Sequence, residues 1–172
     1  MKSKYLIFAL IVAVLAPALL MSAVQAQTTY YAQTVAWYEE YGYFADVIDP
    51  NNGRYAHDNS YAKMIVYKAQ GHPANPMARI VYGLSGTARD TVNVHAYVPS
   101  TWMSVQHFYI YVSYYSDSGW VQVYSGILAP EYHGTISVNH NSDFRYIMVV
   151  NYDDFLDSST QEVWIDCVWG TH

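Results

Sequence analysis

The sequence predicts an all-β fold, a two-sheet antiparallel sandwich of about ten strands with a jelly-roll-like layout. Residues that favour strands, mainly Tyr, Val, Ile, Thr and Trp, recur in short runs separated by clusters of Gly, Pro, Asn, Asp and Ser. After Ala26, no segment repeats its apolar residues at the 3.6-residue period of an amphipathic helix. Strands and turns therefore account for this part of the chain.

The first segment has the layout of a secretory signal peptide. Lys2 and Lys4 precede a long apolar run, which ends at the small residues around Ala26. We therefore expect a signal peptide at residues 1–26 and a single secreted domain at residues 27–172, placed outside the cell or on its surface. An uncleaved membrane anchor is the alternative, because an apolar run of this length can span a bilayer.

Strands are expected throughout the part of the chain that follows. The Ser116–Gly119 turn separates two long strand-like runs and is expected to form a hairpin loop. The expected strands are Thr29–Tyr38, Tyr43–Ile48, Tyr61–Lys68, Ala78–Ser85, Thr91–Val98, Val105–Tyr115, Gly119–Leu128, Thr135–His140, Phe144–Tyr152 and Gln161–Trp169.

Charge and motifs exclude several functions. The chain holds 14 acidic against 8 basic residues, and Lys2 and Lys4 lie in the expected signal peptide. Such an acidic domain repels phosphate backbones, so we expect no nucleic-acid partner. The sequence contains no P-loop, dinucleotide fingerprint, zinc-protease motif or nucleophile elbow, and we do not expect an enzyme.

The single cysteine, Cys167, rules out an internal disulfide. We expect a buried thiol, because free cysteine is among the most buried residue types. Strict alternation would place Cys167 on the same face as Val163, Ile165 and Trp169. An intermolecular disulfide is the alternative.

Aromatic side chains gather on the face that two neighbouring strands are expected to turn away from the core. Alternation in 105–115 and 119–128 assigns to this outer face Tyr109, Tyr111, Trp120 and Tyr124. A contiguous aromatic patch suggests a contact surface. The alternative is that loops or cross-strand pairs cover these rings.

Two acidic segments could bind Ca²⁺, which accepts carboxylate, amide and backbone oxygens. One is the loop before the last strand, with Asp153, Asp154 and Asp157, and the other is the turn that holds Asp49 and Asn51. The alternative for the second is an ordinary Asx-type turn.

The segment Thr29–Tyr38 follows the expected cleavage site directly. Alternation places Tyr31, Val35 and Trp37 on one face. A free strand at a new N-terminus can enter a neighbouring subunit as a donor strand, and such head-to-tail contacts generate filaments or tubes. The alternative is that it is the first strand of its own sandwich.

This layout resembles the secreted filament and tube subunits of archaea, above all the cannula-forming proteins, with donor-strand pilins and threads behind them. The resemblance implies a structural subunit that forms an extracellular homopolymer, with Thr29–Tyr38 as donor strand. It also implies Ca²⁺ at subunit contacts, with Asp153, Asp154 and Asp157 as ligands. The competing hypothesis is a secreted carbohydrate-binding module whose outer aromatic side chains stack on the sugar rings of a polysaccharide.

Overall fold

A computed structural model describes residues 26–42, 44–54, 58, 60–67, 75–99, 104–153 and 160–172. The expected signal peptide therefore lies outside the described residues, except for Ala26. Within them the chain forms ten strands and one short 3₁₀ helix, η1. Their bounds are β1 Thr29–Tyr41, β2 Ala45–Ile48, η1 Pro50–Arg54, β3 Ala62–Tyr67, β4 Met77–Ala88, β5 Thr91–Tyr97, β6 Val105–Ser113, β7 Val121–Leu128, β8 His133–Asn139, β9 Phe144–Tyr152 and β10 Thr160–Thr171.

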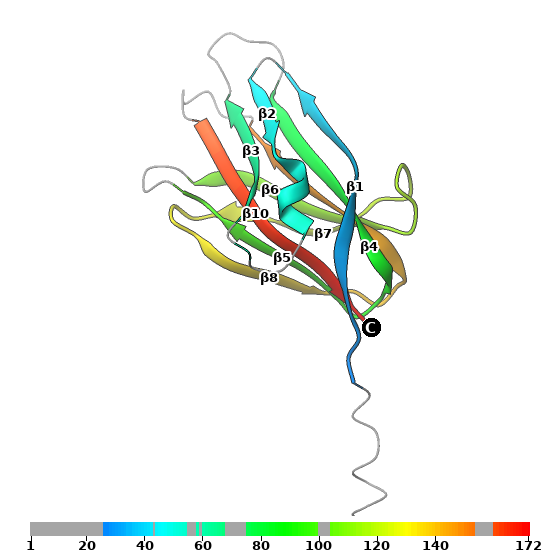
Figure 1. Ribbon diagram of the computed structural model, residues 1–172. Coiled ribbons are helices and arrows are strands. Elements are labelled where there is room, and N and C mark those ends of the chain that lie inside the picture. Colours follow the sequence, from blue (N-terminus) through cyan, green and yellow to red (C-terminus); the bar gives the residue numbers. More distant parts are fainter. Residues whose placement is uncertain are drawn as a thin grey trace, which may run out of the picture.

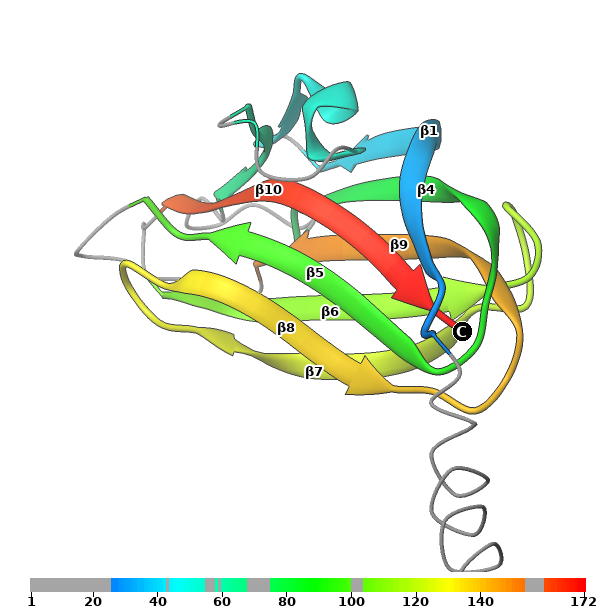
Figure 2. The ribbon, with the colours of Figure 1, turned by 60° about the horizontal axis from the view of Figure 1, so that its bottom comes forward.

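The strands form two antiparallel sheets, which confirms the predicted sandwich (Figure 1, Figure 2). Sheet A has the order β2-β3-β10-β5-β8, and sheet B has the order β1-β4-β9-β6-β7. Strands that are adjacent in a sheet are often distant in the chain. In sheet A, β10 lies between β3 and β5, and in sheet B, β9 lies between β4 and β6. No helix in the described part of the chain has the length and apolarity needed to cross a membrane.

Strand β1 joins the two sheets along one edge (Figure 1). Its first residues, Thr29 to Tyr31, pair with β10, and the rest of the strand pairs with β4 from Ala32 onward. Main-chain hydrogen bonds between Thr28 and His172 close this end of the molecule. The segment expected to act as a donor strand is therefore paired within its own chain.

The three residues expected on one face of the donor strand also point to different places. Val35 packs against the core, Trp37 lies on the outer face of sheet B, and Tyr31 contacts the ring of Trp169 at 6.1 Å. The reason is that β1 shifts register between Ala32 and Thr34 and again between Val35 and Trp37. Each irregularity of this kind reverses the alternation that follows it.

The core lies between the sheets and consists of alternate residues of the facing strands. Its largest fully buried side chains include Tyr82, Phe108 and Phe144. Full burial of a Val, Ile or Phe side chain contributes about 1.5–3 kcal/mol to folding. Truncating a ring such as that of Phe108 would cost about 3–5 kcal/mol through lost burial and a residual cavity.

Cys167 is buried, as expected, but its face is not the expected one. Ile165 and Val168 pair with the buried Ala96 and Val94 of β5, whereas Cys167 pairs with the partly exposed His95, because the register of β10 against β5 shifts between Ile165 and Cys167. Burial raises the pKa of the Cys167 thiol to about 12, and the nearby carboxylates of Asp166 and Asp58 act in the same direction. The thiolate form is therefore rare at neutral pH and the thiol is unreactive.

Candidate functional site

The outer face of sheet B carries a second apolar cluster, separate from the core. Val81, Met148 and Val150 are buried although they point away from the sandwich interior. The sequence explains this, because β4 and β9 contain the continuous apolar runs Ile80–Tyr82 and Ile147–Val150, which suit strands covered on both faces. The cover comes from partly buried neighbours on this face, namely Trp37, Met77, Tyr109, Tyr111, Trp120, Tyr146 and Tyr152. We call this face the sheet B face.

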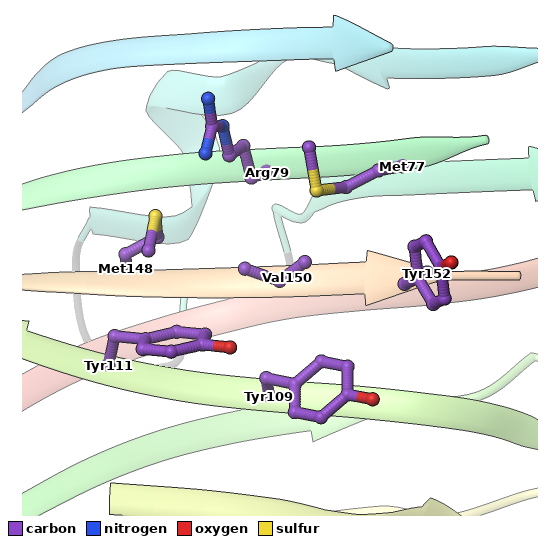
Figure 3. Close-up of a pocket in the computed structure, with 7 residues that line it drawn as sticks. All are labelled: Met77, Arg79, Tyr109, Tyr111, Met148, Val150 and Tyr152. Carbon is purple, nitrogen blue, oxygen red and sulfur yellow. The ribbon is translucent and has the colours of Figure 1, made fainter. Parts of the chain in front are cut away.

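A groove of about 430 Å³ lies on the sheet B face. Figure 3 shows how three neighbouring strands line it, with Met77 and Arg79 on β4, Met148, Val150 and Tyr152 on β9, and Tyr109 and Tyr111 on β6. The four steps along β9 from Met148 to Tyr152 correspond to about 13 Å at 3.3 Å per residue. The lining of the groove therefore extends by this length along the strands and across three adjacent strands, β4, β9 and β6.

Tyrosine rings form one side of the groove. The rings of Tyr109 and Tyr111 lie 6.3 Å apart, and the imidazole of His107 stacks on Tyr109 at 6.1 Å with an angle of 9°. The Tyr109 hydroxyl lies 3.2 Å from Nδ1 of His107, and the Asn75 amide donates to the Tyr152 hydroxyl at 2.6 Å. These contacts fix the rings and leave them half-buried, with part of each surface open to solvent.

The positive charge of Arg79 is already balanced. Its guanidinium forms an ion pair with Glu39 of β1 and lies 5.0 Å above the ring of Trp37. Figure 3 shows the guanidinium turned away from Val150, on the β1 side of β4. Partial burial lowers the pKa of Arg79, but a guanidinium with an ordinary value above 12 stays charged. The groove therefore presents mainly rings, thioethers and hydroxyl groups.

The loop between β6 and β7 lies beside the groove, next to the end that Met148 and Tyr111 line. The Trp37 indole donates to the Ser116 carbonyl at 2.6 Å, and the Trp120 ring meets Trp37 edge-on at 6.5 Å. The hydroxyl of Ser113 donates to the Ser118 carbonyl and accepts from the Tyr115 amide, which holds the loop together. This is the hairpin loop predicted at Ser116–Gly119. We call the Trp37–Trp120 pair the tryptophan wall.

Three of the four aromatic residues predicted for the outer face are found there, namely Tyr109, Tyr111 and Trp120. Tyr124 is the exception, because it packs against the core with its ring 6.3 Å from Phe108. In the pairing of β6 with β7, Ile110 faces Tyr124 and Tyr111 faces Gln122, so β7 holds one extra residue at this point. This irregularity turns Tyr124 inward.

Strand alternation does not identify the β4 and β9 residues of the groove. Met77, Met148, Val150 and Tyr152 lie in strands that alternation alone assigns to a generic core. The signal that could have revealed them is the double-sided apolar character of Ile80–Tyr82 and Ile147–Val150. Trp37 was expected in the donor strand.

A second group of aromatic rings covers the outer face of sheet A. Trp164 lies 5.2 Å from Tyr61 and 5.4 Å from Tyr97, and Tyr61 and Tyr97 lie 6.3 Å apart. The ammonium group of Lys63 sits 4.4 Å from the centre of the Trp164 ring, and the exposed His133 ring meets Tyr97 edge-on. We call this group the sheet A cluster.

The residues proposed as Ca²⁺ ligands are placed as follows. Asp153 is fully buried, whereas Asp154 and Asp157 lie outside the described residues. Asp49 has a positive φ of 50°, accepts a bond from the Asn52 amide and precedes η1. Among the described residues, no three His, Cys, Asp or Glu side chains come together as a metal site. Calcium binding at either segment stays a prediction.

Comparison with known proteins gives the fold but no sequence family. No protein-family model and no curated protein matches the chain. The chain resembles in structure the module CBM32-3 of a family 31 glycoside hydrolase from Clostridium perfringens, with a TM-score of 0.53 and 16% identity over 83% of this chain and 91% of that one. It also resembles the CBM32 of AlyQ, solved in complex with 4,5-unsaturated mannuronic acid, with a TM-score of 0.50 and 14% identity over 79% and 96% of the two chains.

A third similar structure is a cleaved adhesin domain of Lys-gingipain from Porphyromonas gingivalis, with a TM-score of 0.54 and 14% identity over 85% of this chain and 99% of that one. The fold is a β-sandwich like that of carbohydrate-binding modules. The expected resemblance to cannula-forming proteins and donor-strand pilins is therefore wrong, and so is the predicted function as a filament subunit. The layout of the chain, without a specific motif, does not identify a filament subunit.

Proposed function

We propose that this domain is a carbohydrate-binding module that holds a polysaccharide in the groove of the sheet B face. The observation that carries the proposal is the row of half-buried rings, Tyr109 and Tyr111 on β6 with Tyr152 across on β9, along a groove of about 430 Å³. Two of the structurally similar proteins are named as carbohydrate-binding modules, which supports the same conclusion. This was the competing hypothesis drawn from the sequence.

The chemistry of the groove suits sugar rings. A pyranose ring has apolar C–H faces and a rim of hydroxyl groups. Tyrosine matches both features, because its ring packs against the C–H face while its hydroxyl donates and accepts hydrogen bonds. Met148 and Val150 form an apolar floor, and their burial provides the rigid support that a binding site needs.

The groove supports binding better than hydrolysis. A glycoside hydrolase needs two carboxyl groups on either side of the scissile bond, about 5–10 Å apart. The described residues that line the groove include no carboxylate, and Glu39 beside the groove forms an ion pair with Arg79. We therefore propose a non-catalytic partner for an extracellular polysaccharide, consistent with the expected export signal at residues 1–26.

The test is native affinity electrophoresis of the domain through gels that contain xylan, galactomannan, mixed-linkage β-glucan or alginate. We expect at least one polysaccharide to retard the domain, and Tyr109→Ala to restore free migration. Tyr97→Ala is the matched control, because it removes a tyrosine of similar exposure from the sheet A cluster. If no polysaccharide retards the domain, or if the two variants behave alike, the proposal is wrong.

A further inference from the structure

The sheet B face is organised in rows that run across the strands. Trp37 pairs with Val81, Val81 with Met148 and Met148 with Tyr111, so these four residues form one row. The next row on the same side of the sheet is Glu39, Arg79, Val150 and Tyr109, and the third is Tyr41, Met77, Tyr152 and His107. The groove lies mainly over the second and third rows, between β4 on one side and β6 on the other.

The tryptophan wall stands over the first row. Trp37 comes from β1, at one edge of sheet B, and Trp120 immediately precedes β7, at the other edge. Their rings nevertheless meet at 6.5 Å, and both pack on the cluster of Val81, Met148 and Val150. The side chain of Trp37 and the loop before Trp120 therefore meet above the face, between its two edges.

Several contacts fix this wall in place. The Trp37 indole is held by the Ser116 carbonyl and lies under the guanidinium of Arg79, which is itself paired with Glu39. The side-chain bonds of Ser113 keep the loop in one shape, and Gly119 adopts the positive φ of 68° that the return into β7 requires. Moving the wall would break all of these contacts together.

We propose that the groove is blind at the tryptophan wall and therefore binds the end of a glycan chain, with the terminal sugar unit against Trp37 and Trp120. The inference rests on the proposed function and adds the part of the polysaccharide that is recognised. A chain that lies along the groove over Val150 and Tyr152 reaches the wall and cannot continue past it. A site for internal segments needs a groove that lets the chain leave at both ends.

The experiment uses the polysaccharide that retards the domain most strongly, cut into fractions of narrow length. Isothermal titration of each fraction gives a Kd per mole of chains. We expect this Kd to stay constant within about twofold for all chains long enough to fill the groove, because each chain offers one end of the right kind. Binding per unit mass then rises as the chains are shortened.

A Kd per mole of chains that improves in proportion to chain length would overturn the inference, because every internal segment would then count as a site. In that case the proposed function would stand. If neither the parent polysaccharide nor any fraction binds, the proposed function falls as well. The two failures are therefore distinct.

A wall variant sharpens the test. Trp120→Ala should keep the groove, open its closed end and make the Kd depend on chain length. Tyr115→Ala is the matched control, because Tyr115 lies in the same loop, is 62% exposed and takes no part in the wall. Thermal melting of both variants shows that each still folds. If Trp120→Ala folds and the Kd still shows no dependence on length, the wall is not what limits the chain.

Discussion

Both outer faces of the sandwich are rich in aromatic side chains, yet they are built differently. In the sheet A cluster, Tyr61, Tyr97 and Trp164 pack tilted or edge-on against one another, and Lys63 covers a face of Trp164. On the sheet B face, Tyr109 and Tyr111 are tilted in the same way, but both lie on one strand and have a groove beside them. Rings that satisfy one another stabilise a sheet, whereas rings that line a hollow are available to a ligand.

The comparison teaches that the number of aromatic residues on a face does not identify a site. Both faces present half-buried rings, and a count from sequence alternation would treat them alike. What separates them is register, because β6 places His107, Tyr109 and Tyr111 at every second position of one strand. The sheet A rings come instead from β5, from β10 and from Tyr61, which directly precedes β3, and they converge on Trp164.

The largest effect is expected for removal of two groove rings. The double variant Tyr109→Ala/Tyr111→Ala should weaken polysaccharide binding by about 3 kcal/mol, roughly a hundredfold in Kd, because aromatic anchors dominate binding energy. Titration calorimetry measures this change. The double variant Tyr61→Ala/Tyr97→Ala on the other face should leave Kd unchanged. Equal losses in both would mean that the two faces do not differ in function.

The opposite pattern, a loss of stability without a loss of polysaccharide binding, is expected for Trp164→Ala. This variant should lower the free energy of unfolding by about 2 kcal/mol, because it removes a half-buried ring and its contacts with Tyr61 and Tyr97. The melting temperature should fall by about 4–8 °C for a domain of this size. Calorimetric melting checks the change, and Kd should not move. A weaker Kd with unchanged stability would assign ligand binding to the sheet A cluster.

A smaller effect is expected when the charge beside the groove is released. Glu39→Gln leaves the guanidinium of Arg79 without its ion-pair partner. We expect affinity for alginate, a polyanion, to rise by up to about fivefold, since exposed ion pairs contribute about 0.2–1 kcal/mol. The gain should disappear at high salt. Affinity electrophoresis at two salt concentrations measures it, and no gain at low salt would show that Arg79 does not face the ligand.

The sequence predicted the fold class and the strand positions well, for a physical reason. Alternation of apolar and polar residues is a local property, and it survives into the structure wherever a strand is regular. The expected strand Phe144–Tyr152 matches β9 at both ends, and the expected strand Val105–Tyr115 contains all of β6. The Ser116–Gly119 loop was likewise visible from its turn residues.

The site was less predictable, because it depends on strand order and on irregularities. The groove needs β4, β9 and β6 as neighbours, although more than 50 residues separate β4 from β9 in the chain. A register shift in β1 places Trp37 on the opposite face from Val35, although alternation predicts one face for both. Shifts in β7 and β10 likewise place Tyr124 and Cys167 on faces other than the predicted ones. A single extra residue moves every later side chain to the other face, and nothing local in the sequence marks it.

The smallest effect is expected at Lys63, and it tests whether the sheet A cluster fills its own face. Lys63→Met keeps an unbranched side chain of similar length but removes the charge above Trp164. Stability should fall by about 0.5 kcal/mol, the value for an exposed cation–π contact, and chemical denaturation resolves it as a shift of midpoint. Polysaccharide binding should stay the same. If the uncovered Trp164 ring instead begins to bind polysaccharide, the Lys63 ammonium group is what keeps ligands off this face. The two faces would then differ in ligand binding through one side chain and not through their whole architecture.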